Sequence, residues 1–263
     1  YLNTPPPSDQ EAEINHLYAE SLYSAKRFKE AVTQFERTAY EYEDYKKSDE
    51  AAYFALVAYQ SRLNELPDEP EEETVRQQKD KIRQAKIDSS LMFAETFPEH
   101  EKVPQVLQNT AEDQLARDKL DAAIKTAGML VHREPKPAEN YLVYGWRTIA
   151  NGEFDQGRYK VAEFAYKKLL ALPSVTGEER TRAQEQIAAS VYKQGEALEK
   201  EGKLAKAAET YLRVAQVYPE ATIRKHADFD AATLFIKQDN HERAIPILES
   251  FRKRYPEDKL AET

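Results

Sequence analysis

The sequence contains no cysteine and only 7 glycines among its 263 residues. Without cysteine the chain has no disulfide bond, no thiolate ligand for zinc and no cysteine nucleophile. The scarcity of glycine argues against strand-rich folds and the glycine-rich loops that hold nucleotide phosphates, and it favours helices. A lack of thiols is compatible with an oxidising compartment, but many cytosolic proteins also lack cysteine.

Long apolar segments and basic clusters are missing as well. No apolar run approaches the roughly 18 residues that cross a bilayer, so we expect no direct membrane insertion. The formal net charge is −9, and no stripe of Lys and Arg is present to displace counterions from nucleic acid. The densest charged run, residues 65–73, is acidic and is interpreted as a solvated loop leading into a helix start.

Catalytic and metal-binding motifs are also absent. The chain has no G-x-S-x-G, no Walker loop and no H-E-x-x-H. The five histidines form no metal-ligand spacing, and His16 with Glu20 is interpreted as an exposed pair on one helix. We therefore predict no catalytic residue, no metal site and no cofactor, and hence a protein that is not an enzyme.

What the sequence does contain is an internal repeat. Five segments share a short turn, an apolar or aromatic residue, and an alanine three positions later. They begin at Lys26, Asp118, Gly157, Gly202 and Asp239. Pro135, Pro219 and Pro256 each follow such an alanine by 12 residues. Apolar residues between these points recur at three- and four-residue steps, which indicates amphipathic helices that each proline ends.

These residues resemble the tetratricopeptide repeat, which has W-x2-L-G-x2-Y in its first helix, A-x3-F in its second and a closing proline. Trp146, Ile149 and Ala150 follow the first-helix pattern, with alanine for glycine. The second-helix pattern is matched at Ala31 and Phe35, Ala162 and Tyr166, and Ala207 and Tyr211. The second unit departs from it, with Lys86 where the alanine should stand.

The resemblance implies an all-α fold, a right-handed α-solenoid of about six helical hairpins. We expect a single domain over residues 1–263, with a lead-in at 1–8, insertions near 64–72 and 174–179, and a C-terminal end that continues in a longer protein. Close packing of the two helices of a unit is expected at small residues. These are Ala19, Ala111, Ala150, Gly195 and Ala232.

The resemblance also implies where a partner binds, because ligands of this family contact fixed positions on the first helix of each unit. Carried onto this chain, these positions give a set of candidate groove residues. They are Tyr23, Tyr144, Arg147, Asn151, Phe154, Tyr192, Glu196, His226 and Phe229. A chaperone-type clamp for a C-terminal carboxylate is not expected, because Glu112 and Glu196 flank the matching pair Arg147 and Asn151 and would repel a carboxylate.

The unit endings suggest a subtype. Phe97-Pro98, Tyr218-Pro219 and Tyr255-Pro256 resemble the repeats of bacterial envelope proteins, such as the outer-membrane assembly lipoprotein of the BamD kind and the Tol-associated periplasmic coordinator. We therefore predict a non-catalytic scaffold that binds a protein or peptide in its concave groove, located in the periplasm. The alternative is a ligand-responsive regulatory domain of a larger cytoplasmic signalling or transcription protein. The oligomeric state is left open.

Overall fold

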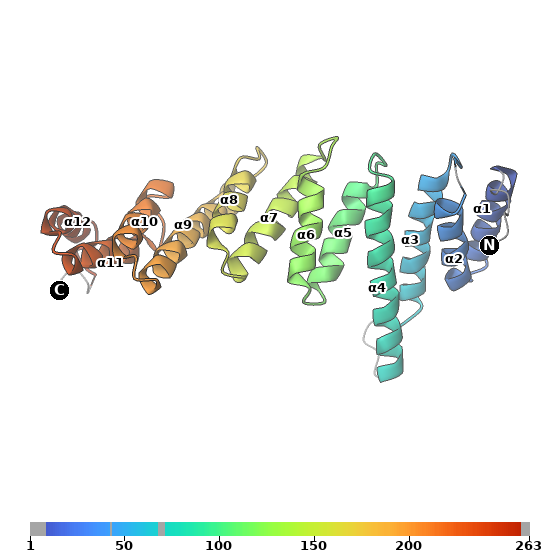
Figure 1. Ribbon diagram of the computed structural model, residues 1–263, viewed down its shortest axis with the longest axis horizontal. Coiled ribbons are helices and arrows are strands. Elements are labelled where there is room, and N and C mark those ends of the chain that lie inside the picture. The colour runs from blue at the N-terminus through green and yellow to red at the C-terminus, as the bar shows by residue number, and fades with distance from the viewer. Residues whose placement is uncertain (1–8, 43, 68–71, 259–263) are drawn as a thin grey trace. The chain divides into compact units, whose positions relative to one another are not determined.

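The computed structural model describes residues 9–42, 44–67 and 72–258. Within these ranges all regular secondary structure is helical, in twelve α-helices (Figure 1). The helices are α1 (Asp9–Ser24), α2 (Phe28–Tyr40), α3 (Ser48–Asn64), α4 (Glu73–Thr96), α5 (Val103–Leu115), α6 (Leu120–Val131), α7 (Glu139–Asp155), α8 (Tyr159–Leu170), α9 (Gly177–Lys200), α10 (Leu204–Val217), α11 (Arg224–Lys237) and α12 (His241–Arg254).

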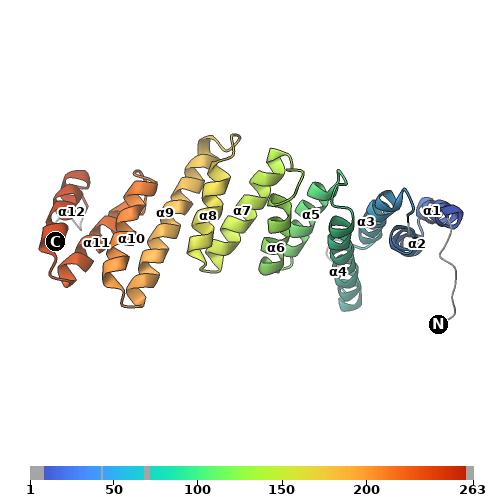
Figure 2. The same cartoon turned by 45° about the horizontal axis from the view of Figure 1, so that its top comes forward.

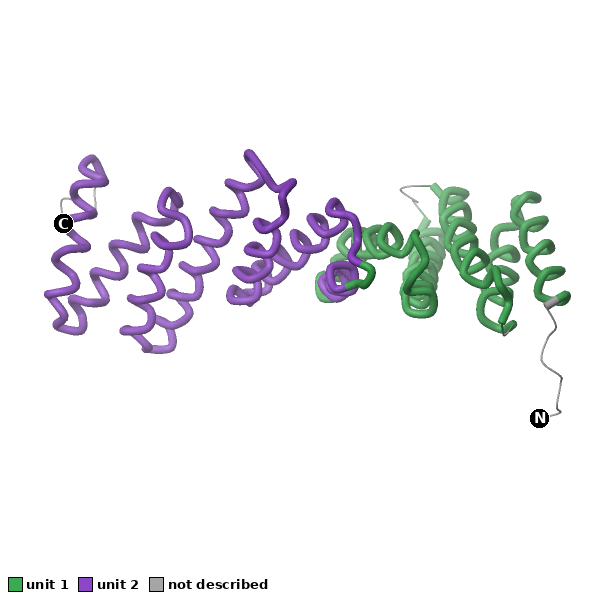
Figure 3. Tube along the Cα trace, turned by 90° about the horizontal axis from the view of Figure 1, so that it is seen from above, with its two compact units in different colours: residues 1–122, 133–135 green, residues 123–132, 136–263 purple. Residues whose placement is uncertain are grey.

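The chain divides into two compact units (Figure 3). Unit 1 comprises residues 1–122 and 133–135, and unit 2 comprises residues 123–132 and 136–263. In unit 1, α1 packs on α2, α2 on α3, α3 on α4 and α4 on α5. In unit 2, each helix from α7 to α12 packs on the next in the chain, so that hairpins follow one another side by side (Figure 2).

The prediction of an all-α repeat of about six helical hairpins is confirmed. That residues 1–263 form one domain stays a prediction. The expected lead-in at residues 1–8 and the C-terminal residues 259–263 lie outside the described residues. The first insertion falls between the end of α3 at Asn64 and the start of α4 at Glu73, and the second immediately precedes and opens α9.

The turns inside the hairpins explain the pattern that the five repeated segments share. The first residue of every repeated segment has a positive φ, between 54° and 74°. These residues are Lys26, Asp118, Gly157, Gly202 and Asp239. The amide of the following residue donates to a carbonyl five residues earlier, as from Lys203 to Leu198 at 2.9 Å. This is the Schellman ending, which satisfies the last carbonyls of the first helix and reverses the chain into the second.

Small residues bring the two helices of a hairpin together, as the sequence predicts. Ala19, Ala111, Ala150 and Ala232 are fully buried. Between hairpins the large residues Phe35, Tyr166 and Tyr211 are buried as well. The core is therefore built from small residues opposite large ones, which lets close-packed layers interlock.

One sequence-based interpretation is wrong. His16 is not part of an exposed pair, because its ring is buried and Nδ1 lies 3.0 Å from the Tyr45 hydroxyl. That hydroxyl donates to Glu13 at 2.7 Å. The turn after α2 carries Tyr45 back onto α1, a contact across 29 residues that no helical spacing predicts.

Candidate partner-binding groove

A groove in unit 2 collects two of the predicted residues. Arg147 and Asn151 stand one turn apart on α7, so both side chains lie on the same face of the helix. The first turns of α9 form the opposite wall, and α8 contributes Tyr166. The groove has a volume of about 600 Å³. The lining also includes Glu178, Glu179, Arg182 and Gln186.

Two polar contacts organise this groove. Arg147 Nη2 lies 2.7 Å from Glu179 Oε1, and the two side chains are 49% and 39% exposed. An ion pair this hydrated contributes little to stability and can be exchanged for a ligand group. The Tyr166 hydroxyl donates to Asn151 Oδ1 at 2.7 Å, which turns the amide NH2 of Asn151 away from Tyr166. Burial, together with the charge of Asp155, raises the pKa of Tyr166 to about 12, so this donor stays protonated.

A second polar cluster joins α9 to α11. The Tyr192 hydroxyl donates to Asp230 Oδ2 at 2.7 Å, and the Tyr211 hydroxyl donates to Glu199 Oε2 at 3.0 Å. The two tyrosine rings lie 5.1 Å apart. Burial raises the pKa of Tyr192, and the hydrogen bond to Asp230 acts in the same direction.

The carboxyl group of Asp230 is perturbed as well. Burial raises its pKa, and the negative charges of Glu199 and Glu196 act in the same direction, against the hydrogen bond from Tyr192 and the charge of His226. His226 is exposed, and Glu196 pairs with Lys193 at 2.7 Å. The predicted residues Tyr192, Glu196 and His226 therefore surround one acidic cluster.

The remaining predicted residues lie in packing contacts. Tyr23 is in unit 1, where its hydroxyl lies 2.9 Å from Ser61 Oγ and links α1 to α3. Phe154 packs edge-on against Tyr159, with ring centroids 5.3 Å apart.

Two other predicted aromatic residues are half-buried. Phe229 packs against Phe251 at 6.0 Å between ring centroids. The hydroxyl of Tyr144 is enclosed, and this residue does not line the groove of Arg147. The binding role of these four aromatic residues stays a prediction.

Several groove residues escaped the sequence analysis. Glu179, Arg182 and Gln186 belong to the long N-terminal part of α9, and Tyr166 enters the sequence analysis only as part of the second-helix repeat pattern. The signal that could have found them is the insertion near residues 174–179, because it lengthens α9 beyond an ordinary first helix and sets extra turns opposite α7.

Across residues 9–42, 44–67 and 72–258, no three His, Asp or Glu side chains are grouped as metal ligands would be. Over the same ranges, every helix is too short or too polar to span a bilayer.

Comparison with known families bears on the two C-terminal hairpins. The tetratricopeptide repeat family matches residues 189–221 and 226–258. The first segment covers the second half of α9 with α10, and the other covers α11 and α12. These hairpins are tetratricopeptide repeats. For these two hairpins, the superfamily predicted from the sequence is thus confirmed. Tetratricopeptide repeats use extended surfaces to bind proteins or peptides, and this general function is the one that the repeats support.

Solved structures of similar fold share little sequence with this chain. PilF of Pseudomonas aeruginosa is 11% identical, with 97% of this chain and 96% of that chain covered at a TM-score of 0.35. PilW, a type IV pilus biogenesis factor, is 11% identical, with 97% of this chain and 98% of that chain covered at a TM-score of 0.33. The TPR2AB domain of yeast Sti1, in its complex with an HSP90 peptide, is 12% identical, with 97% of this chain and 95% of that chain covered at a TM-score of 0.29. Among curated proteins, no sequence matches this chain. None of these similarities bears on what this chain binds.

Proposed function

We propose that this protein is a non-catalytic scaffold that binds a peptide or a partner domain in the groove between α7 and α9. The observation that carries this proposal is the hydrated ion pair between Arg147 and Glu179 beside the oriented amide of Asn151. A partner segment can exchange one member of the pair for its own charged group at small cost. Arg and aromatic side chains are also the residues that most often dominate binding energy in interfaces.

The chemistry of the groove favours a partner with both charges. Arg147 and Arg182 can donate hydrogen bonds to carboxylates, while Glu178 and Glu179 can accept them from Lys or Arg side chains. Further along unit 2, the acidic cluster around Asp230 favours a basic residue. The proposed ligand is therefore an extended segment of mixed charge, which crosses α9 from the Arg147 groove to the Tyr192 cluster.

A photo-crosslinking experiment tests this proposal. A photoreactive amino acid is placed at Gln186, which is exposed and lines the groove, and in a matched protein at Lys168, which is exposed and lies outside it. Envelope and soluble extracts of a bacterial host are then irradiated with each protein. We expect a discrete adduct from the Gln186 protein alone, and we expect Arg147→Glu to abolish it. Arg252→Glu, an exposed change on α12, is the control and should preserve the adduct. Equal adducts from positions 186 and 168 would exclude the groove.

We further propose that the scaffold works in a bacterial envelope complex in the periplasm. What supports this is the resemblance of the unit endings, in which Tyr218 and Tyr255 each precede a proline that ends the helix. The crosslinking extracts provide the test, since the partner should come from the envelope fraction. An adduct formed only with soluble cytoplasmic proteins would contradict the location without touching the groove.

A further inference from the structure

The second hairpin departs from its neighbours at two positions on one face of α4. The other five hairpins carry a buried alanine at the first position. These are Ala31, Ala123, Ala162, Ala207 and Ala244. The second hairpin has Lys86 there, and four residues later it has Ser90 where Phe35, Tyr166 and Tyr211 fill the space between hairpins. The second hairpin thus has a larger, charged residue in place of the alanine and a smaller, polar residue in place of the aromatic ring that packs between hairpins.

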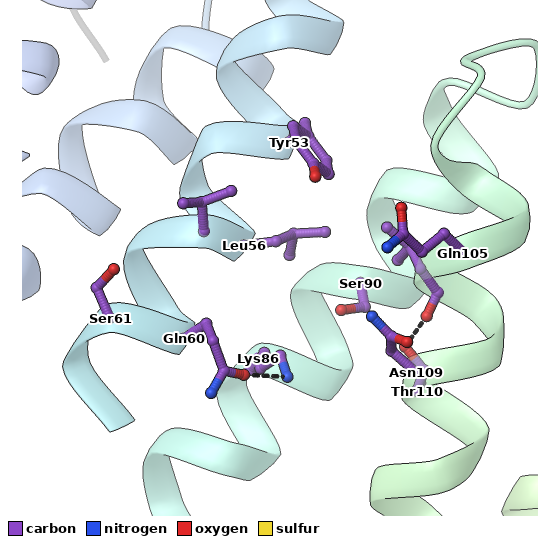
Figure 4. A pocket seen from close by; sticks show the side chains of 11 residues that line it. Tyr53, Leu56, Gln60, Ser61, Lys86, Ser90, Gln105, Asn109 and Thr110 are labelled. Atoms are coloured by element: carbon purple, nitrogen blue, oxygen red, sulfur yellow. Dashed lines mark hydrogen bonds between the residues drawn. The ribbon is translucent and has the colours of Figure 1, made fainter. Parts of the chain in front are cut away.

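The result of this double departure is a cavity within unit 1, between α3, α4 and α5. Its volume is about 240 Å³, and both Lys86 and Ser90 line it. Figure 4 shows Tyr53 and Leu56 of α3 on one side and Gln105 and Asn109 of α5 on the other. The space left by the missing aromatic ring is therefore open rather than collapsed.

In the third hairpin, a close approach of the next helix takes the place of the missing ring. This hairpin also lacks the aromatic residue, with Ala127 at that position, but Gly145 on the next helix allows α7 to come close. A Cβ atom at Gly145 would lie 2.4 Å from Val131 Cγ1 and 3.4 Å from the Ala127 carbonyl. At the position of α5 that matches Gly145 stands Val106, which lines the cavity instead.

Lys86 is held in place at this cavity. Its side chain is only 14% exposed. Its Nζ donates to Gln60 Oε1 at 2.8 Å (Figure 4) and to Asp113 Oδ2 at 3.0 Å. Gln60 is itself oriented, because its amide nitrogen donates to Asn64 Oδ1 at 2.9 Å. An ammonium group has three hydrogens, so one remains for a ligand.

The charge of the cavity wall selects the ligand. Among the described residues that line it, Lys86 is the one charged side chain, since Asp113 pairs with Lys86 from outside the lining. The exposed amides of Gln105 and Asn109 stand on the α5 side as further donors. Tyr53, Leu56 and Val106 supply apolar surface.

We propose that this cavity binds the carboxylate side chain of a glutamate on a partner protein. The carboxylate accepts a charge-assisted hydrogen bond from Lys86, and the two methylene groups pack against Tyr53, Leu56 and Val106. The site lies wholly within unit 1. It therefore goes beyond the groove of Arg147 and can be tested without it.

The test uses the full chain and a small probe. N-acetyl-glutamate amide is titrated into ¹⁵N-labelled protein, and the side-chain amide signals of Gln60, Gln105 and Asn109 are followed by NMR. We expect saturable shifts of these signals. The uncharged N-acetyl-glutamine amide should bind at least tenfold more weakly. Equal shifts with the two probes, or no shift with either, would overturn the proposal.

Three variants sharpen the result. Lys86→Ala restores the alanine of the other hairpins, and Lys86→Met keeps the stem but removes the charge. Each should weaken binding of the glutamate probe at least tenfold, while Arg147→Glu in unit 2 should leave it unchanged. We expect the folded state to tolerate both changes at Lys86, because the Asp113 carboxylate left behind is 33% exposed and can be hydrated by water. Undiminished binding by a folded Lys86 variant would assign the shifts to another surface.

Discussion

Gly195 of α9 lies directly against the ring of Tyr211 on α10. A Cβ atom at Gly195 would come within 2.5 Å of Tyr211 Cε1 and 2.6 Å of Cδ1. The absence of a side chain at this position therefore sets the distance between the two helices of the fifth hairpin. It also places the Tyr211 hydroxyl on Glu199.

Gly195→Ala should destabilise the protein by about 1–3 kcal/mol, because the methyl group displaces the buried Tyr211 ring. Urea unfolding followed by circular dichroism measures the change. The control is Gly128→Ala on α6, where the added Cβ would meet nothing within 4 Å apart from its chain neighbours and the backbone of its own helix. This control should gain about 0.5–1 kcal/mol from helix propensity. Equal effects of the two substitutions would contradict the close approach.

The turn residue Gly202, with φ of 74°, provides a second prediction. Gly202→Ala should cost about 1–2 kcal/mol, because a Cβ disfavours the left-handed conformation. Gly202→Asn should cost less, since asparagine tolerates this region. Conversely, Lys26→Gly should stabilise the first hairpin, because Lys26 has φ of 59°. Thermal unfolding of the three variants measures these differences, and a stabilising Gly202→Ala would refute the assignment of the turn.

The buried carboxylate of Glu163 connects three helices of unit 2. It accepts hydrogen bonds from Lys167 at 2.6 Å, from Gln194 of α9 at 2.8 Å and from Arg213 of α10 at 2.7 Å. Burial alone would raise the pKa of Glu163, but the bonds from Lys167 and Gln194 and the charge of Arg213 lower it. Its contribution to stability is thus complete above the ordinary glutamate pKa and is lost as pH falls through the lowered value.

Glu163→Gln should therefore destabilise the protein at pH 7, by about 1–2 kcal/mol. The two cations are half-exposed, so water limits the loss. The matched control is Glu178→Gln, which breaks a fully exposed pair with Arg182 and should have little effect. Chemical denaturation at pH 7 and at pH 3 measures both variants, and the difference between wild type and Glu163→Gln should shrink at the lower pH.

Asp230 should have the opposite pH dependence. Its pKa is raised in the folded state, so its contribution is complete below the ordinary aspartate pKa and is lost as pH rises through the raised value. Asp230→Asn should be more stable than the wild type at pH 7, since the amide oxygen can still accept the Tyr192 hydroxyl. The difference in unfolding free energy between Asp230→Asn and the wild type should shrink toward pH 3, with a slope of at most about 1.4 kcal/mol per pH unit. Urea unfolding across this range measures it, and a gap that does not vary with pH would show that Asp230 is not perturbed.

The candidate groove was only partly predictable. The helical register placed Arg147 and Asn151 on one face, and the structure brings both into the groove. The same register selected Phe154 and Phe229, whose rings are engaged in packing against neighbouring rings. Position on a helix indicates which way a side chain starts, but a long aromatic side chain then takes whichever rotamer its neighbours leave open.

The sequence by itself determined the hairpins, because proline spacing, turn residues and helical periodicity act within one hairpin. It also determined the close approach at Gly195, since the repeat pattern requires a small residue there. Only the tertiary structure decided the pairing of Arg147 with Glu179, the burial of His16 under Tyr45, and the open cavity at Lys86. The first and last of these join one hairpin to the next, and the second brings a connecting turn back onto α1. The register between hairpins depends on how their side chains interlock rather than on the spacing inside either one.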